Sequence, residues 1–174
     1  MLTLMLIAAA LQAPAAPASQ TLAPLACTAQ PNFVTRERLP FEGSASFHFS
    51  GTVTAEAMEG EDFVPFASVA LLQQGRPEEL SAVMSVHPWT GRRYDVTLRR
   101  LINDELRERT IIGRVPNAGS VPFEIEVTPA RMIVFRLGEV VSHVPLGSFR
   151  PDAIVLGCAS GSFRFDNLVF RSGA

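Results

Sequence analysis

Four short stretches near the C-terminus decide the fold: FEIEVTP (123–129), MIVFRLGEVV (132–141), IVLGC (154–158) and FRFDNLVF (163–170). Each is rich in β-branched or aromatic residues and contains or precedes a glycine, a proline or a Gly/Ser turn. Short runs of this composition, bounded by turn residues, are typical of β-strands. They predict an all-β protein with little or no helix.

The same kind of signal continues upstream of these stretches. Over 45–57 the odd positions are mostly apolar and the even ones are Ser, His, Thr and Glu, which predicts a strand with one wet face. The run 63–72 is apolar on both faces and predicts a central strand. For 101–109 we expect a hairpin that turns at Asn103 and Asp104, with a short helical turn as the alternative. Strands recur about every ten to fifteen residues, the spacing of a sandwich or barrel.

The N-terminal segment 1–18 has the pattern of a signal peptide. An apolar run (2–11) is followed by Ala/Pro-rich sequence that ends in Ala16-Pro17-Ala18, which matches an h-region and a small-residue cleavage site. The run is much shorter than the roughly 20 residues needed to cross a bilayer as a helix. Because no Lys or Arg precedes it, the alternative is an unstructured leader on an intracellular protein. We expect a periplasmic or secreted protein with no transmembrane segment.

Length and charge limit the architecture and the partners. Without 1–18 the chain has the length of one domain, and we expect 19–40 to hold an N-terminal linker and the first strand and 41–171 the sandwich domain. The formal net charge is −2, so there is no electrostatic case for nucleic acid as a partner. All 15 basic residues are Arg, which makes Arg the only cation available for an anionic ligand.

The chain has two cysteines, Cys27 and Cys158, which are 131 positions apart. In an exported protein they predict a disulfide that ties the first strand to a late one. The alternative is a lipid-modified Cys27, since Leu25-Ala26-Cys27 faintly resembles a lipobox. Pro24 stands where that motif has Leu.

The order of the strands resembles that of the concanavalin A-like lectin/glucanase superfamily, whose laminin-G-like fold is an antiparallel jelly-roll β-sandwich of two curved sheets. The resemblance covers about 41–170. Four pieces carry it: GRRYDVTL (91–98), FEIEVT (123–128), the hairpin 133–141 and the closing pair 154–170. It implies that the first and last strands are neighbours, as a Cys27–Cys158 bridge requires. The superfamily contains lectins, binding modules, hydrolases and lyases, so it favours carbohydrate without fixing an activity.

Glucanases of this superfamily carry a Glu-x-Asp-x-x-Glu strand, and the nearest match here is Glu124-Ile125-Glu126. Alternation puts the two carboxylates on one strand face, about 6.5–7 Å apart at Cα. The Asp and the second Glu of the motif are absent. A solvated strand face explains the pair as well, so we assign no catalytic residue.

Four residues are candidate ligand contacts: His48, Trp89, Arg93 and Asp95. His48 lies in the polar row of 45–57, where hydroxyls of a glycan would find hydrogen-bond partners. Trp89 is the only tryptophan, and an exposed indole stacks well on a sugar ring. Arg93 and Asp95 share a strand face with Arg99, where Arg binds carboxylate or sulfate bidentately. The structural alternatives are an ordinary polar face, a Trp that caps the sandwich and a surface ion ladder.

Other chemistries find little support in the sequence. It has no nucleophile elbow, phosphate-binding loop, dinucleotide fingerprint or metal-ligand spacing of His residues, and no cofactor is predicted. A structural Ca²⁺ lacks a recognisable loop pattern. We therefore expect a non-catalytic binding domain for a carbohydrate, such as a cell-envelope glycan, or another envelope component. The alternatives are a glycoside hydrolase or polysaccharide lyase with carboxylates from different strands on the concave face, such as Glu124 or Glu126 with Asp95, and a structural envelope protein.

Overall fold

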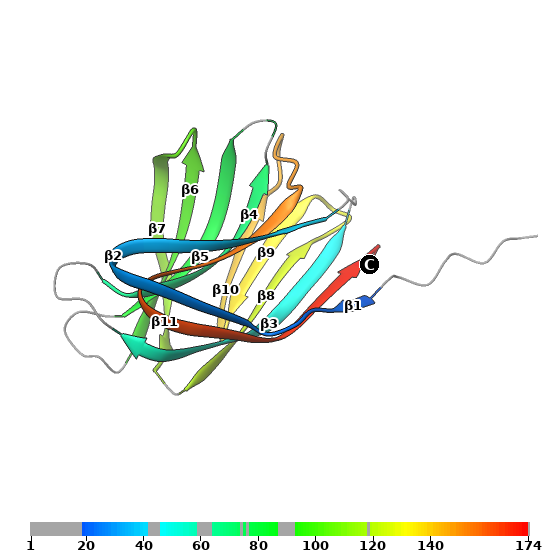
Figure 1. Cartoon of the computed structure of the whole chain (residues 1–174). Helices are drawn as coiled ribbons and strands as arrows, with labels where there is room; N and C mark the ends of the chain where they lie inside the picture. The colour runs from blue at the N-terminus through cyan, green and yellow to red at the C-terminus, as the bar shows by residue number, and fades with distance from the viewer. Residues whose placement is uncertain are drawn as a thin grey trace, which may run out of the picture.

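The computed structural model describes residues 19–41, 46–58, 64–73, 75, 77–86, 93–117 and 119–173. The predicted signal peptide and the loop that contains Trp89 lie outside these residues. All regular elements of the described part are strands, shown in Figure 1. Their bounds are β1 (Ser19–Thr21), β2 (Leu25–Pro40), β3 (Phe47–Met58), β4 (Phe66–Gln73), β5 (Glu78–Val86), β6 (Arg93–Ile102), β7 (Glu105–Pro116), β8 (Ser120–Val127), β9 (Met132–Leu137), β10 (Val140–Pro145) and β11 (Ala153–Ser172).

The strands pair antiparallel in the order β10-β9-β8-β3-β11-β4-β5-β6-β7, and β1 and β2 also pair with β11. Strand β11 belongs to two layers, because its residues up to Ala159 pair with β4 and those from Gly161 on pair with β3. Strand β2 follows the other edge of β11 through both layers (Figure 1). The result is an antiparallel jelly-roll sandwich, as predicted. One layer contains β4, β5, β6 and β7 together with the parts of β2 and β11 that pair beside β4, and we call it the β4–β7 sheet. The other contains β3, β8, β9 and β10 together with the remaining parts of β2 and β11, and we call it the β8–β10 sheet.

Strands β2 and β11 bend together where they pass from one sheet to the other. Asn32 and Ser160 both have left-handed backbone conformations, with φ of 66° and 48°, and the Asn32 N–H donates to Ser160 Oγ at 3.0 Å. The register shifts between Ala159 and Gly161. A β-carbon on Gly161 would lie 2.5 Å from the carbonyl oxygen of Ala57, so only glycine fits at this corner.

The predicted disulfide is confirmed and lies beside this corner. Cys27 and Cys158 are bonded, their Cα atoms are 6.0 Å apart, and both are buried in the core. Cys27 pairs opposite Phe163 in the β8–β10 sheet, whereas Cys158 pairs opposite Ala67 in the β4–β7 sheet. The bond therefore fastens the two sheets to each other.

The core fills the space between the inward faces of the sheets. The β8–β10 sheet contributes mainly phenylalanines from β3, β8 and β11, and the β4–β7 sheet contributes aliphatic residues and Tyr94. Strand β4 lies between β11 and β5 and is largely buried on both faces, so the prediction of a central strand is confirmed. No helix of the described part is long and apolar enough to cross a membrane.

The hairpin predicted within 101–109 is also confirmed. Strands β6 and β7 are joined through Asn103 and Asp104, whose φ angles are 53° and 62°. Two consecutive left-handed residues match the tight turn whose twist suits a hairpin, and Asn and Asp tolerate that conformation better than most residues.

Candidate functional site

The outer face of the β4–β7 sheet carries most of its long charged side chains. Cross-strand register places Arg38, Val155, Ala70, Ser81, Arg99 and Arg109 in one row across the six strands of this sheet. We call this surface the arginine face. Its charged residues are Arg36, Arg38, Arg93, Arg99, Arg109, Arg114, Glu79 and Asp95.

The middle of the arginine face is a floor of small side chains. Ala153, Gly157, Ala70 and Ser81 are buried although they point away from the core. At Gly157 the neighbours are Ser68 and Arg36, because an added β-carbon would lie 2.8 Å from Ser68 Oγ and 3.6 Å from Arg36 Cγ. The floor is therefore shielded from solvent, and the polar side chains above it form the surface that a ligand would meet.

An ion pair crosses this floor. Arg36 Nη1 on β2 donates to Glu79 Oε2 on β5 at 2.8 Å. On a flat sheet, β2 and β5 would be separated by three inter-strand spacings, about 14 Å, with β11 and β4 between them. Arg36 therefore reaches across two intervening strands to contact Glu79. The Glu79 side chain is 9% exposed and that of Arg36 is 49% exposed, so the carboxylate is shielded from water while the guanidinium is half-exposed.

Arg99 lies at the other side of the floor. Its guanidinium stands 5.3 Å from the centre of the Phe66 ring, a cation–π contact, and its buried Nε has no hydrogen-bond partner. Arg109 pairs directly opposite it on β7. The pKa of Arg99 is lowered from its ordinary value, chiefly because burial removes water from the guanidinium and further because of the Arg109 charge, while Glu79 acts in the opposite direction.

Two of the predicted ligand contacts, Arg93 and Asp95, lie on the arginine face. Asp95 Oδ1 accepts from Arg114 Nε at 2.8 Å, so its partner is on β7 and not on its own strand. Arg93 is exposed at the start of β6. Trp89, the third candidate, lies outside the described residues, and its role stays a prediction.

His48, the fourth candidate, is on the outer face of the other sheet. Its Nε2 lies 3.8 Å from Glu124 Oε2, which also forms an ion pair with Arg136 Nε at 3.2 Å. The His48 Nδ1 is buried without a partner. Because the sheets pack through their inner faces, their outer faces point away from each other. The structure therefore brings Arg93 and Asp95 together and separates both from His48, and it also separates Asp95 from Glu124 and Glu126.

Sequence reasoning missed most of the arginine face. Arg36 and Arg38 alternate on β2, and Arg99 and Arg109 stand in one hairpin, so period-two spacing of Arg was an available signal. It did not show that β2 lies in the same sheet as β6, since that depends on the pairing of β2 with β11.

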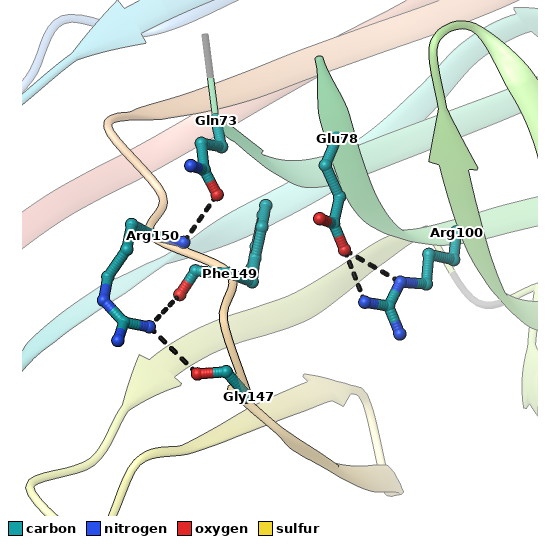
Figure 2. Close-up of polar contacts among 6 residues, drawn as sticks. All are labelled: Gln73, Glu78, Arg100, Gly147, Phe149 and Arg150. Atoms are coloured by element: carbon teal, nitrogen blue, oxygen red, sulfur yellow. Dashed lines mark hydrogen bonds and ion pairs between the residues drawn. The ribbon is translucent and has the colours of Figure 1, made fainter. Parts of the chain in front are cut away.

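Two other features, an apolar pocket and a buried ion pair, lie outside the arginine face. An apolar pocket of about 320 Å³ opens beside β2 and β11, lined by Leu39, Phe41, Phe49 and Phe170 among others. Elsewhere, Arg100 donates from Nε to the buried Glu78 Oε1 at 2.9 Å, near the loop in which Arg150 bonds Gln73 and the carbonyls of Gly147 and Phe149 (Figure 2). Within the described residues, no group of three or more His, Cys, Asp or Glu side chains is placed to hold a metal ion.

No protein-family model and no curated protein matches the sequence. Solved structures match it in fold. The carbohydrate-binding module CBM66 from Bacillus subtilis has a TM-score of 0.55 at 9% identity, over 88% of this chain and 95% of the module. An alginate lyase from Pseudomonas aeruginosa has a TM-score of 0.53 at 10% identity, over 72% of this chain and 64% of the lyase. A human galectin-16 variant has a TM-score of 0.53 at 12% identity, over 79% and 95%.

Identities this low show the fold alone. The chain has the concanavalin A-like jelly-roll fold that the strand order indicated. Proteins of this fold include a carbohydrate-binding module, a galectin and a lyase, so the fold is shared by binding proteins and enzymes.

Proposed function

We propose that this chain is a non-catalytic domain that binds a carbohydrate, such as a cell-envelope glycan, in the periplasm or outside the cell. The arginine face is the binding surface. The observation that carries the proposal is the gathering of exposed guanidinium groups, those of Arg36, Arg93 and Arg114, with the carboxylates of Glu79 and Asp95 on this one face. These side chains accept and donate hydrogen bonds to a sugar ring that lies against them.

The chemistry of this surface suits sugar hydroxyls. Each hydroxyl both donates and accepts, so a binding surface needs donors and acceptors in alternation. The pairs Arg36–Glu79 and Arg114–Asp95 supply both, and each is held in place by a charge-assisted hydrogen bond, which is stronger than a neutral one. Arg93 adds an exposed guanidinium to the same face.

Binding without catalysis is supported by the state of the carboxylates. Glu79 and Asp95, the carboxylates of the arginine face, are each engaged by an arginine at 2.8 Å. Glu124 lies on the opposite outer face. The match to a whole carbohydrate-binding module and to a galectin, each over 95% of its own length, supports a binding role for a domain of this size.

Export is supported by the disulfide. Cys27–Cys158 is a bond between two buried cysteines, and such structural bonds persist in oxidising compartments. This fits the signal-peptide pattern of 1–18 and the proposed periplasmic or secreted location. A disulfide-bonded Cys27 also has no free thiol for a lipid anchor.

One observation favours a second candidate function, a carbohydrate-active enzyme. His48, Glu124 and Arg136 are in contact on the outer face of the β8–β10 sheet, and an imidazole next to a carboxylate is a common general base. This candidate predicts release of sugar ends that is lost in His48→Gln. The binding proposal predicts no turnover of any polysaccharide that the chain binds.

The test of the proposed function is a glycan array probed with the exported chain and with Arg36→Gln and Trp89→Ala. Binding to at least one glycan, reduced at least about tenfold by Arg36→Gln, is expected. Arg164→Gln is the matched control, because it removes the same charge from the outer face of the other sheet. A blank array with folded protein contradicts the proposal and favours a structural envelope protein. Binding that Arg36→Gln leaves unchanged contradicts the choice of face.

A further inference from the structure

Arg99 and Arg109 are like charges placed opposite each other. They occupy one register position of the β6–β7 pair on the arginine face, where facing like charges destabilise a strand pair. Three other arginines of this face form ion pairs with carboxylates: Arg36 with Glu79, Arg38 with Asp152 and Arg114 with Asp95. Among the described residues, no carboxylate forms an ion pair with Arg99 or Arg109.

The surroundings of Arg99 do not compensate for this repulsion. Ser81 pairs opposite it on β5, and it is neutral. The carboxylate whose charge acts on Arg99 is Glu79, and it is hydrogen-bonded to Arg36. Arg99 also has a buried Nε with no hydrogen-bond partner. Arg99 is thus a partly dehydrated guanidinium with an unused N–H donor, and a second guanidinium lies next to it. This arrangement favours binding of an anion.

We propose that Arg99 and Arg109 form a subsite for the anionic group of an acidic glycan, either a uronate carboxylate or a sulfate ester. This inference rests on the proposed function, because it takes the arginine face as the glycan-binding surface, and it adds the ligand class. Arg38 stands in the same row at the β2 side of the face, so a sugar chain lying across the strands meets cations at both ends of that row.

The experiment measures affinity for three soluble polymers at matched ionic strength: polygalacturonate, a sulfated galactan and a neutral galactan. The exported chain is expected to bind one or both anionic polymers at least about tenfold more tightly than the neutral one, as charge-assisted hydrogen bonds allow. Preference for polygalacturonate identifies a carboxylate ligand, and preference for the sulfated galactan identifies a sulfate ester. Arg99→Gln/Arg109→Gln is expected to abolish the preference, while Arg164→Gln keeps it.

A second variant guards against a folding defect, because Arg99 also covers Phe66. Arg109→Gln alone removes one exposed charge. It is expected to lower the affinity for the anionic polymer at least about threefold and to reduce the salt dependence of that affinity. Equal affinity for anionic and neutral polymers, or unchanged binding by both variants, overturns the subsite while leaving the proposed function intact. Failure of the folded chain to bind any polymer or any arrayed glycan overturns both.

Discussion

Cys27 and Cys158 connect the two sheets of the sandwich across its core. Neither cysteine is the register partner of the other, since Cys27 pairs opposite Phe163 and Cys158 pairs opposite Thr35. Their bond spans the corner at which β2 and β11 both change sheets. The disulfide thus holds the sandwich closed at the place where a hydrogen-bonded ladder is interrupted.

We expect Cys27→Ala/Cys158→Ala to lower the free energy of unfolding by about 3–5 kcal/mol, because the bond closes a long loop in the unfolded chain. Urea denaturation of the oxidised wild type and the variant measures this difference. The reduced wild type is the control and is expected to resemble the variant. A loss below about 1 kcal/mol would show that the corner is held without the bond.

We expect Gly161→Ala to lower the free energy of unfolding by about 3 kcal/mol, at the upper end of the usual overpacking cost. The new β-carbon would lie 2.5 Å from a backbone oxygen, that of Ala57, which cannot rotate away. Gly75→Ala is the matched control, because nothing lies within 4 Å of a β-carbon at Gly75. Thermal and urea denaturation compare the two variants, and equal stabilities would contradict the tight corner.

We expect Arg100→Met to lower the free energy of unfolding by about 3–5 kcal/mol, because it leaves a buried carboxylate without its cation. The Glu78 side chain points toward Arg100 (Figure 2) and is 3% exposed. Arg107→Met is the control, since its partner Glu105 is 67% exposed and an exposed pair contributes about 0–1 kcal/mol. If both variants lose the same stability, the Glu78–Arg100 pair contributes no more than a surface pair.

We expect stability to fall above about pH 10 through Tyr94. Burial raises the pKa of this phenol above its ordinary value of 10.0, and its hydroxyl donates to Asn117 Oδ1 at 2.6 Å. Above that pH the unfolded phenol loses its proton while the folded one keeps it, so the unfolded state binds fewer protons and the free energy of unfolding decreases as pH rises. Below about pH 10 the phenol is protonated in both states, so this loss of stability is absent.

Tyr94 is the only tyrosine, so ultraviolet absorbance of the phenolate reports this group alone. In the folded protein it is expected to titrate later than in urea. Tyr94→Phe is expected to remove this additional loss of stability above about pH 10. Identical titrations in the folded and urea-unfolded protein would refute the burial argument.

The hairpin at Asn103 and Asp104 and the alternating strand β3 were predictable because their signals are local. Turn residues and period-two alternation act within a few neighbours, and the structure places both elements as expected. The Cys27–Cys158 pairing was predictable for a different reason, since two cysteines allow a single intramolecular bond.

The candidate site was only half predictable. Arg93 and Asp95 were found because they alternate on one strand, and their shared face follows from the pleat. The opposite placement of His48, and the arrival of Arg36 from β2 over Gly157, depend on which strands pair. The pairing of strands that are far apart in the chain cannot be predicted from a short stretch of sequence.

By itself, the sequence determined the β-strands and one polar face on each amphipathic strand, and it predicted an antiparallel sandwich with a Cys27–Cys158 bond. Alternation and turn chemistry depend only on residues that are close together in the chain, so a short stretch of sequence is enough to predict them. Only the tertiary structure decided that β2 and β11 pass through both sheets, and that Arg99 and Arg109 meet Arg36 and Arg38 on one face. That outcome comes from the register of strands far apart in the chain, which packing of the common core selects.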